Sequence, residues 1–304
     1  MKRHSDIVEL IAKEGFEAAA LETFRFQAVH LDIYRRYIEL LGIKPEEVTS
    51  LDGIPFLPIE FFRSHRVYCG EGVEELVFNS SGTTGGDTSS HYVASAALYR
   101  DSYEYGFREF FGDMGEYRLV TLLPSYRSGS SLLHMIEGLR GQCTGERVLL
   151  WGVTFALLEE AMSGRDVRLP EGSIVLETGG MKGREYEISR EELHRVLCEA
   201  YGVESIASEY GMCELLSQGY SFGGGVFRPC GTMRIIGRDI ESPLVTGLVG
   251  ERCGINVIDL SNRYSCSFLA TGDCGVVYED GSFEIYGRIE GEILRGCNML
   301  SFND

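Results

Sequence analysis

Between residues 74 and 210, short apolar segments alternate with longer segments of helical periodicity, and this alternation limits the possible folds more than any other feature. The strand-like segments read ELVFNS, YRLVTLLP, ERVLLWGV, GSIVLETG and SIASEYG. Helical patterns lie between them near 94–111, 129–140, 154–163 and 189–200, the last of which opens on a capping box of Ser189 and Glu192. Parallel strands are joined by crossover helices. The pattern therefore predicts an α/β core with a mainly parallel sheet over residues 76–225.

The segments on either side of this core have different patterns. Residues 1–75 are predicted to be mostly helical, because apolar side chains recur at helical spacing at Ile7, Leu10, Ile11, Phe16 and Leu21. Within that region, the proline-containing segment GIPFLPIEFFRSH predicts an extended connector. Residues 226–304 are predicted to form a small β-rich subdomain with antiparallel strands at GTMRIIGRDI, CGINVIDL, CSFLATGD, CGVVYED and GSFEIYGR.

Composition excludes several classes of protein. The net charge of −18 leaves no basic field for nucleic acid, so no nucleic-acid partner is expected. The nine cysteines form no CxxC pair, which argues against a zinc site or a redox dithiol. No signal-peptide pattern and no apolar run long enough for a membrane span is present, so the sequence predicts a cytoplasmic protein with reduced thiols.

The segment NSSGTTGG at residues 79–86 combines hydroxyl side chains with glycines directly after a predicted strand. Hydroxyls and converging backbone N–H groups suit an oxyanion such as a phosphate, and glycine permits the backbone conformations that such convergence needs. The segment is neither a P-loop nor a dinucleotide GxGxxG fingerprint. Taken alone, it is explained equally well by a plain Ser/Gly turn.

Four later segments carry residues suited to nucleotide chemistry, and each also has an ordinary structural explanation. The glycines of ETGGMKGR let a flat ring approach the backbone, or form a turn. In SEYGMCE, Tyr210 can stack on a base and Glu214 can hold Mg²⁺, or they are a core tyrosine and a surface acid. Asp273 of LATGD is predicted to end a strand and bind a ribose diol, or to lie in a turn. Arg288 suits a phosphate, or a surface ion pair.

The order of these five segments resembles the order of the core motifs in the adenylate-forming superfamily, which includes acyl-CoA synthetases and peptide-synthetase adenylation domains. The motif match spans about residues 76–292. Within the superfamily, the chain most resembles the LuxE-like acyl-protein synthetases, which activate fatty acids. The segments PFLPIEFFRSH, LLWGVTFALLE, SEYGMCELLSQ and RGCNML carry that resemblance over nearly the whole chain.

The resemblance implies an enzyme that uses ATP and Mg²⁺ to activate a carboxylic acid as an acyl-adenylate and then transfers the acyl group to a thiol. The acid is expected to be a fatty acid. Its phosphate loop implies ATP contacts from Ser80, Ser81, Gly82, Thr83, Thr84 and Gly85. The family's adenine turn implies that Gly179, Gly180 and Met181 line the adenine pocket. The later motifs imply that Tyr210 stacks on adenine, Glu214 binds Mg²⁺ and Asp273 binds the ribose hydroxyls, and the last motif places Arg288 in the nucleotide site.

Two departures from the family pattern affect the expected chemistry. The family's GRxD motif precedes a lid domain that carries a catalytic lysine, whereas Glu290 holds the Asp position here and the sequence ends at Asp304. We therefore expect the lid to be absent, and we expect either Lys182 and Arg184 or a partner protein to supply the cation at the α-phosphate. The LuxE-like resemblance implies that Cys297 carries the acyl group. The neighbouring Arg295 would favour the thiolate form of Cys297. An inert, buried thiol is equally expected.

Other features of the predicted site remain open at the level of sequence. His134 lies where the family shapes its substrate-binding pocket, but a histidine in an apolar helix is equally expected in the core. The acyl acceptor is either a partner protein, such as a reductase or a carrier, or coenzyme A, as in phenylacetate-CoA ligases. A catalytically silent nucleotide-binding subunit is the alternative from another class.

Overall fold

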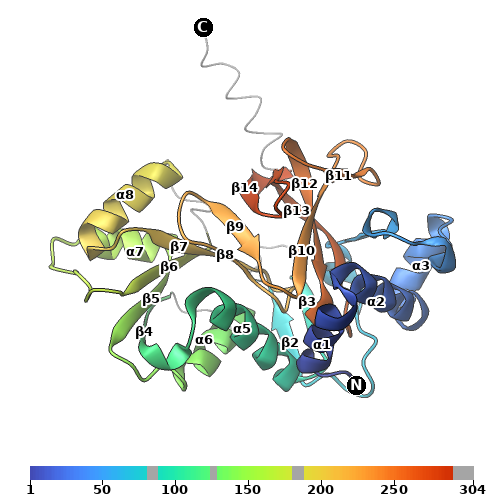
Figure 1. The fold of residues 1–304 in the computed structure, drawn as a ribbon, viewed down its shortest axis with the longest axis horizontal. Helices are drawn as coiled ribbons and strands as arrows, with labels where there is room; N and C mark the ends of the chain where they lie inside the picture. The colour runs from blue at the N-terminus through green and yellow to red at the C-terminus, as the bar shows by residue number, and fades with distance from the viewer. Residues whose placement is uncertain (81–87, 124–128, 180–187, 290–304) are drawn as a thin grey trace, which may run out of the picture.

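The computed structural model describes residues 1–80, 88–123, 129–179 and 188–289. Its main feature is one long sheet, in which the strands pair in the order β11-β10-β12-β13-β14-β9-β8-β7-β6-β5-β4 (Figure 1). The short strand β1 pairs with β13 beside this path, and β2 and β3 form a separate two-stranded sheet.

The parallel half of the sheet is the predicted α/β core. Its neighbouring strands are β4 (Tyr117–Leu122), β5 (Arg147–Val153), β6 (Ile174–Thr178) and β7 (Ile206–Tyr210). The helices are α5 (Ala96–Phe111), α6 (Ser131–Arg140), α7 (Thr154–Ala161) and α8 (Arg190–Tyr201). All four predicted helices are confirmed, and Ser189 caps α8 by accepting from the Glu192 N–H, whereas the Glu192 carboxylate binds Arg195.

Helices cover both faces of this parallel half, which explains why its strands are apolar almost throughout. In β5, Val148 and Leu150 pack with residues of α7 and α8, while Leu149 and Trp151 belong to the larger core that includes α5 and α6. Successive residues of one strand therefore enter two different cores. A side chain on β7 likewise faces either α8 or α5 according to its position in the alternation.

The antiparallel half contains the predicted β-rich region, and it begins earlier, at β8, within residues that were predicted to belong to the α/β core. Its strands are β8 (Gly219–Ser221), β9 (Val226–Pro229), β10 (Met233–Arg238), β11 (Thr246–Leu248), β12 (Arg252–Asp259), β13 (Phe268–Val277) and β14 (Phe283–Arg288), with the 3-10 turn η4 (Leu260–Asn262) after β12. The parallel half joins the antiparallel half where β7 pairs with β8. Further along the sheet, β14 pairs with β9 through two registered residue pairs, Phe283 with Phe227 and Glu284 with Val226, and this pairing joins strands β4–β9 to strands β10–β14.

Two predictions about strands in these regions are wrong. CSFLATGD and CGVVYED are not two strands but the single strand β13, so Asp273 lies within a strand rather than at its end. The strand continues through a register shift at Cys274 and Gly275, where an added Cβ would lie 1.7 Å from the Glu284 carbonyl oxygen. Glycine therefore permits the close strand approach that keeps the ladder intact.

The segment ELVFNS forms a strand, but outside the parallel sheet in which it was predicted. It becomes β2 (Leu76–Asn79), which pairs antiparallel with β3 (Ser90–Val93) across the hydroxyl- and glycine-rich segment. The sequence did not reveal β3 because its inward positions are His91 and Val93, and a buried histidine masks the alternation of apolar residues. The hairpin brings both ends of that segment together.

The N-terminal region is helical as predicted. It contains α1 (His4–Glu14), α2 (Phe16–His30) and α3 (Asp32–Leu40), then the 3-10 turns η1 (Pro45–Glu47) and η2 (Leu51–Gly53). The connector holds β1 (Leu57–Pro58) but also the one-turn helix α4 (Phe61–Ser64), which sequence reasoning missed. Its prolines precede this turn, so they do not prevent it. The turn η3 (Met114–Glu116) leads into β4.

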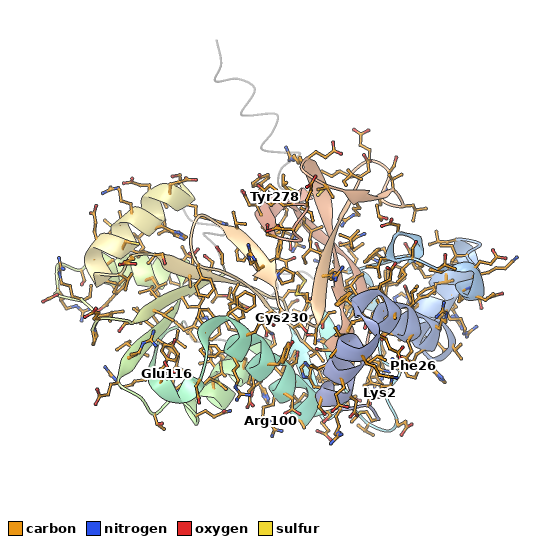
Figure 2. All side chains as sticks on the ribbon, in the orientation of Figure 1. Lys2, Phe26, Arg100, Glu116, Cys230 and Tyr278 are labelled. Atoms are coloured by element: carbon orange, nitrogen blue, oxygen red, sulfur yellow. The ribbon has the colours of Figure 1, made fainter. Side chains whose placement is uncertain are left out.

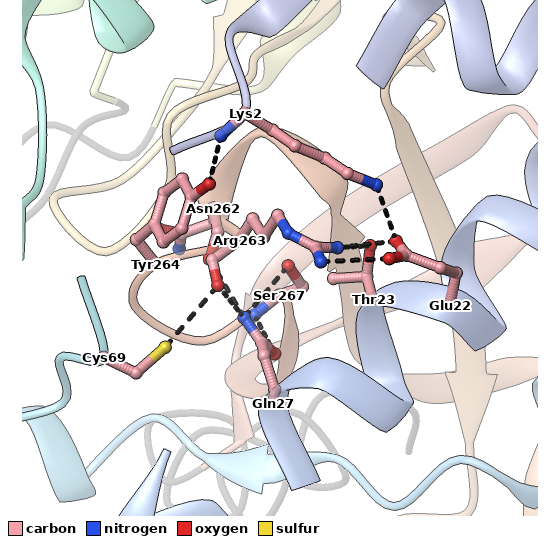
Figure 3. Close-up of polar contacts among 9 residues, drawn as sticks. All are labelled: Lys2, Glu22, Thr23, Gln27, Cys69, Asn262, Arg263, Tyr264 and Ser267. Atoms are coloured by element: carbon pink, nitrogen blue, oxygen red, sulfur yellow. Dashed lines mark hydrogen bonds and ion pairs between the residues drawn. The ribbon is translucent and has the colours of Figure 1, made fainter. Parts of the chain in front are cut away.

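Helix α2 is fastened to the loop that follows β12 (Figure 3). The Gln27 amide donates to the carbonyl oxygens of Asn262 and Arg263, at 3.2 and 2.8 Å, and accepts from the Ser267 N–H at 3.0 Å. The Arg263 guanidinium makes a two-pronged ion pair with Glu22. These contacts fix the loop that carries Asn262, a residue that reaches into the candidate site.

The side chains follow the expected division between interior and surface (Figure 2). Cys230 is only 1% exposed in the interior, whereas Arg100 and Glu116 lie in exposed surface positions. In the part of the chain that the structure describes, no helix combines the length and the apolar character that crossing a membrane requires.

Candidate active site

Three of the predicted site residues meet between strands β4–β9 and strands β10–β14. Tyr210 ends β7, Asp273 lies in β13 and Arg288 ends β14. The Tyr210 hydroxyl donates to Asp273 Oδ2 at 3.0 Å, and Arg288 Nη1 donates to Asp273 Oδ1 at 3.3 Å. The Arg288 side chain stays 42% exposed, so the cluster opens to solvent on the guanidinium side.

The glycine of the TGD segment has a specific steric role in this cluster. Asp273 and Arg288 are cross-strand partners, and the guanidinium lies across the backbone of Gly272. A Cβ at position 272 would lie 2.8 Å from Arg288 Nη2 and 3.1 Å from its Cζ. Glycine is therefore required for Arg288 to occupy this position above the strand.

Buried polar contacts hold the rest of the TGD segment. Thr271 Oγ1 donates to the Ile255 carbonyl oxygen at 2.8 Å and accepts from the Asp273 N–H at 3.1 Å. Arg238 is buried and donates to the carbonyl oxygens of Thr271 and Ile255 and to Asn256 Oδ1. Burial lowers the pKa of Arg238, although nearby acids including Asp273 oppose the change. The segment is thus fixed from its backbone as well as its side chains.

Glu214 connects this cluster with the stem of the hydroxyl- and glycine-rich segment. Its side chain is 5% exposed and accepts a hydrogen bond from Ser89. Ser89 in turn pairs with Ser80, whose Oγ accepts from the Ser89 N–H at 3.0 Å. Burial raises the pKa of Glu214, while Arg288 and Arg63 act in the opposite direction. The predicted residues Ser80, Glu214 and Arg288 therefore belong to one neighbourhood.

Residues that sequence reasoning did not place in the site hold Glu214 in position. His91 contacts the Cys213 carbonyl oxygen at 2.8 Å and Asn262 Oδ1 at 2.9 Å, and Asn262 Nδ2 donates to the Glu214 carbonyl oxygen at 2.7 Å. Burial lowers the pKa of His91 to about 4. The sequence contains one signal, a histidine directly after the hydroxyl-rich segment. Its role could not be predicted because its contact with residue 213 depends on the hairpin of β2 and β3.

Asp259 anchors the segment that follows Glu214. Its carboxylate accepts from the backbone N–H groups of Leu216, Ser217 and Ser261 and from the Ser217 hydroxyl, at 2.7–3.1 Å. The residue is fully buried, and burial raises its pKa, although these hydrogen bonds oppose the increase. Asp259, at the end of β12, thus fixes the backbone at residues 216 and 217.

Other predicted residues are placed without a test of their role. The Tyr210 ring packs edge-on against Phe283 with a centroid separation of 5.1 Å, so its contact with adenine stays a prediction. Gly179 follows β6 with φ of 89°, a backbone conformation that favours glycine. The His134 ring packs against the rings of Phe78 and Tyr99, with centroid separations of 5.6 and 5.8 Å. Burial lowers the pKa of His134. Both observations fit a histidine in a packed aromatic layer.

The remaining predicted residues lie outside the part of the chain that the structure describes. In the phosphate loop these are Ser81, Gly82, Thr83, Thr84 and Gly85. In the adenine turn and the acyl-carrying tail they are Gly180, Met181, Lys182, Arg184 and Cys297. The roles given to them from the family resemblance stay predictions.

The fold is similar to that of several coenzyme A ligases and synthetases of known structure, which confirms the predicted α/β fold class. ATP-bound MatB from Rhodopseudomonas palustris is similar to this chain with a TM-score of 0.55 and 15% identity, over 72% of this chain and 49% of MatB. An open conformation of 2-hydroxyisobutyryl-CoA ligase with 2-HIB-AMP and CoA is similar with a TM-score of 0.67 and 18% identity, over 90% of this chain and 75% of the ligase.

A third similar structure is O-succinylbenzoate coenzyme A synthetase from Bacillus subtilis with ATP and magnesium, at a TM-score of 0.51 and 16% identity over 70% of this chain and 50% of the synthetase. This chain thus spans about half the length of MatB and of that synthetase. Comparison by sequence finds no matching family model and no matching curated protein. The similarity at these identities establishes the fold.

Proposed function

We propose that this protein activates a carboxylic acid with ATP, forming an acyl-adenylate and pyrophosphate. The observation that carries the proposal is the cluster of Tyr210, Asp273 and Arg288, which three separate strands assemble in the fold of ligases that bind ATP and acyl-adenylates. A carboxylate that is held from both oxygens and still borders an open guanidinium suits a ribose diol beside a phosphate.

The reaction forms a bond between a carboxylate oxygen and the α-phosphorus of ATP and breaks the bond to pyrophosphate. The protein contributes by positioning the reactants and stabilising the charge that develops on the phosphate oxygens. Arg288 has exposed N–H groups beyond its contact with Asp273 and suits this task. We propose Lys182 and Arg184 as further cations and the loop from Ser80 to Gly85 as the cradle of the β- and γ-phosphates.

Glu214 is the proposed protein ligand of Mg²⁺. It is a buried carboxylate without an ion-pair partner in the described ranges, and hard oxygen donors suit this ion. Those ranges contain no group of three or more His, Cys, Asp or Glu side chains that could hold a metal, which fits an ion bound by one carboxylate together with substrate phosphates. When bound, Mg²⁺ neutralises phosphate charge.

Transfer to a thiol is the proposed second step. The adenylate is attacked at its carbonyl carbon by a thiolate, a thioester forms and AMP leaves with the electron pair of the broken bond. The LuxE-like resemblance supports Cys297 as the thiol, followed by a partner protein, and supports a fatty acid as substrate. The similar structure with bound CoA supports coenzyme A as the alternative acceptor.

Acid-dependent exchange of labelled pyrophosphate into ATP tests the first step. We expect exchange with the wild-type protein and a loss of at least about 100-fold in Asp273→Asn, since hydrogen bonds to charged groups contribute about 1.5–3 kcal/mol each. Exposed Asp113→Asn is the matched control. ATP-dependent thermal stabilisation without exchange for any acid would instead identify a silent nucleotide-binding subunit.

Mass spectrometry tests the second step. A labelled acyl group on the wild-type protein that disappears in Cys297→Ala identifies Cys297 as the acceptor. A soluble acyl-CoA formed equally by both proteins identifies coenzyme A and rejects the acyl-protein intermediate.

A further inference from the structure

A second carboxylate, one residue before Tyr210, lies on the opposite side of the sheet from α8 and has no role in the site described so far. Side chains of β7 alternate, so Ser208 faces Glu177 and α8, while Glu209 faces α5. Burial, and secondarily the charge of Glu209, raises the pKa of Tyr99 on α5. Glu209 therefore lies between the sheet and α5, close to the end of β7 that carries the nucleotide cluster.

The hydrogen bonding of Glu209 is incomplete. The Thr178 hydroxyl donates to Glu209 Oε2, and among the described residues no second group donates to Oε1 and no Lys or Arg forms an ion pair with this carboxylate. Burial raises the pKa of Glu209 to about 7, yet the residue keeps part of its surface accessible to solvent. The residue is thus mostly enclosed by protein but not fully buried.

Two further polar atoms beside Glu209 lack partners in the described part of the chain. Tyr220 is the cross-strand partner of Glu209, is 1% exposed, and has an unbonded hydroxyl. Gln218 is 3% exposed, and its Oε1 is unbonded while its Nε2 donates to the Leu216 carbonyl oxygen. A buried polar atom without a partner is costly, so these two atoms beside the free Oε1 of Glu209 indicate a missing polar partner.

The neighbouring glycines show that these side chains lie close together. A Cβ at Gly211 would lie 2.2 Å from Glu209 Oε1 and 3.6 Å from Gln218 Cγ, so both side chains border the same point above the strand. On the facing helix, a Cβ at Gly106 would lie 3.8 Å from Gln218 Oε1, so this amide oxygen faces α5. The orientation of the Gln218 amide is fixed by its donation to Leu216, so its free atom is an acceptor.

We propose that Glu209, Gln218 and Tyr220 recognise a hydrogen-bond donor, a hydroxyl or an ammonium, on the hydrocarbon chain of the acid that this enzyme activates. The proposal rests on the proposed function, because it treats these three side chains as part of the acid-binding site. Glu209 Oε1 and Gln218 Oε1 accept, and Tyr220 can accept or donate, so a donor fits and a plain alkyl chain leaves all three unpaired. Such sites reject analogues that lack the donor, by up to about 10⁴-fold.

Matched acids of one skeleton test this specificity in pyrophosphate exchange. The panel pairs butanoic, hexanoic and octanoic acids with their ω-hydroxy and ω-amino derivatives. We expect kcat/KM at least about 100-fold higher for the preferred donor-bearing acid than for its alkyl parent. The hydroxy and amino arms decide which donor is recognised. Equal or better activity with the alkyl acids would refute the inference while leaving acid activation intact.

Variants separate recognition from a structural role. Glu209→Leu is expected to lose the preference and to gain activity with alkyl acids. Tyr220→Phe keeps the packed ring and removes only the hydroxyl, so a purely structural role predicts no change in preference, whereas we expect a loss of about 10-fold for donor-bearing acids. Glu177→Gln is the control, since Glu177 is a buried carboxylate on the neighbouring strand that faces α8 instead.

Binding without ATP distinguishes failure of this inference from failure of the proposed function. Calorimetry with the same acids should give a Kd at least about 10-fold lower for wild type than for Glu209→Leu with the preferred donor-bearing acid. Such binding without any exchange would reject acid activation and retain the recognition site. Absence of a difference between wild type and Glu209→Leu for every acid in the panel would reject the recognition site.

Discussion

Replacing Gly272 by alanine should separate the Arg288 guanidinium from Asp273 while leaving the fold in place. The new Cβ would lie 2.8 Å from Arg288 Nη2, inside normal contact distance, and Gly272 does not have the positive φ that would strain an alanine. The guanidinium can move because it is 42% exposed, so its contact with Asp273 is lost rather than the strand. An exposed ion pair of this kind contributes about 0.2–1 kcal/mol to folding.

The effect on nucleotide binding should be larger than the effect on stability. Bound ATP would desolvate the cluster, and a hydrogen bond to a charged group there is worth about 1.5–3 kcal/mol, or about 10- to 100-fold in Kd. We therefore expect Gly272→Ala to raise the Kd for ATP by about 10-fold or more, while the free energy of unfolding changes by less than about 1 kcal/mol.

Calorimetric titration with ATP and urea denaturation measure these two quantities on the same samples. Gly115→Ala, at a remote turn, controls for a general effect of glycine replacement. Arg288→Ala should weaken ATP binding as much as Gly272→Ala does, and the double variant should add little. An unchanged Kd in Gly272→Ala, or additive losses in the double variant, would refute the link between Gly272 and Arg288.

Three further predictions concern stability. Asp259→Ala should lower the free energy of unfolding in urea by about 3 kcal/mol or more, because it strands three buried N–H groups and a hydroxyl; a loss below about 1 kcal/mol would contradict this. Burial raises the pKa of Glu177, but hydrogen bonds and charge from His194, Ser208 and Thr154 outweigh burial and hold this pKa below its usual value. Ionised Glu177 therefore stabilises the folded protein above about pH 4.3, and this contribution is lost as the pH falls through the pKa of Glu177 in the folded state. Glu177→Gln should therefore flatten the acid side of the curve of Tm against pH, and an unchanged curve would count against it. Gln27→Leu should lower Tm by several degrees, since it removes the amide that holds the loop after β12, while Gln142→Leu at a less buried position should not.

The parts of the fold that local pattern determines were predictable. The alternation of apolar strands with helical segments sufficed to predict β4 to β7 and α5 to α8, because buried and exposed positions in each segment follow the period of its secondary structure. Strand β3 was not predictable, since its burial depends on a histidine whose partners are residues 213 and 262. The position of Asp273 within β13 was missed for a similar reason, because Gly275 permits a strand to continue where local turn chemistry suggests an end.

The candidate site shows the same division. The order of the motifs anticipated that Ser80, Tyr210, Glu214, Asp273 and Arg288 belong together. In the structure, hydrogen bonds join Tyr210 and Arg288 to Asp273, while Ser80 and Glu214 are linked through Ser89 and the charge of Arg288 acts on Glu214. Sequence reasoning gave Glu209 no role. Its distinctive property is a lack of partners, which depends on Thr178, Tyr220 and Gln218 in other segments and leaves no local trace in the sequence.

The pairing of β14 with β9 has a consequence for the cluster of Tyr210, Asp273 and Arg288. Only two registered residue pairs join strands β4–β9 to strands β10–β14 there, and the hydrogen bond from Tyr210 to Asp273 crosses between these two groups of strands. A rotation of one group of strands relative to the other would therefore change the length of this hydrogen bond. A ligand that binds both Tyr210 and Asp273 would hold the two groups of strands in one relative orientation.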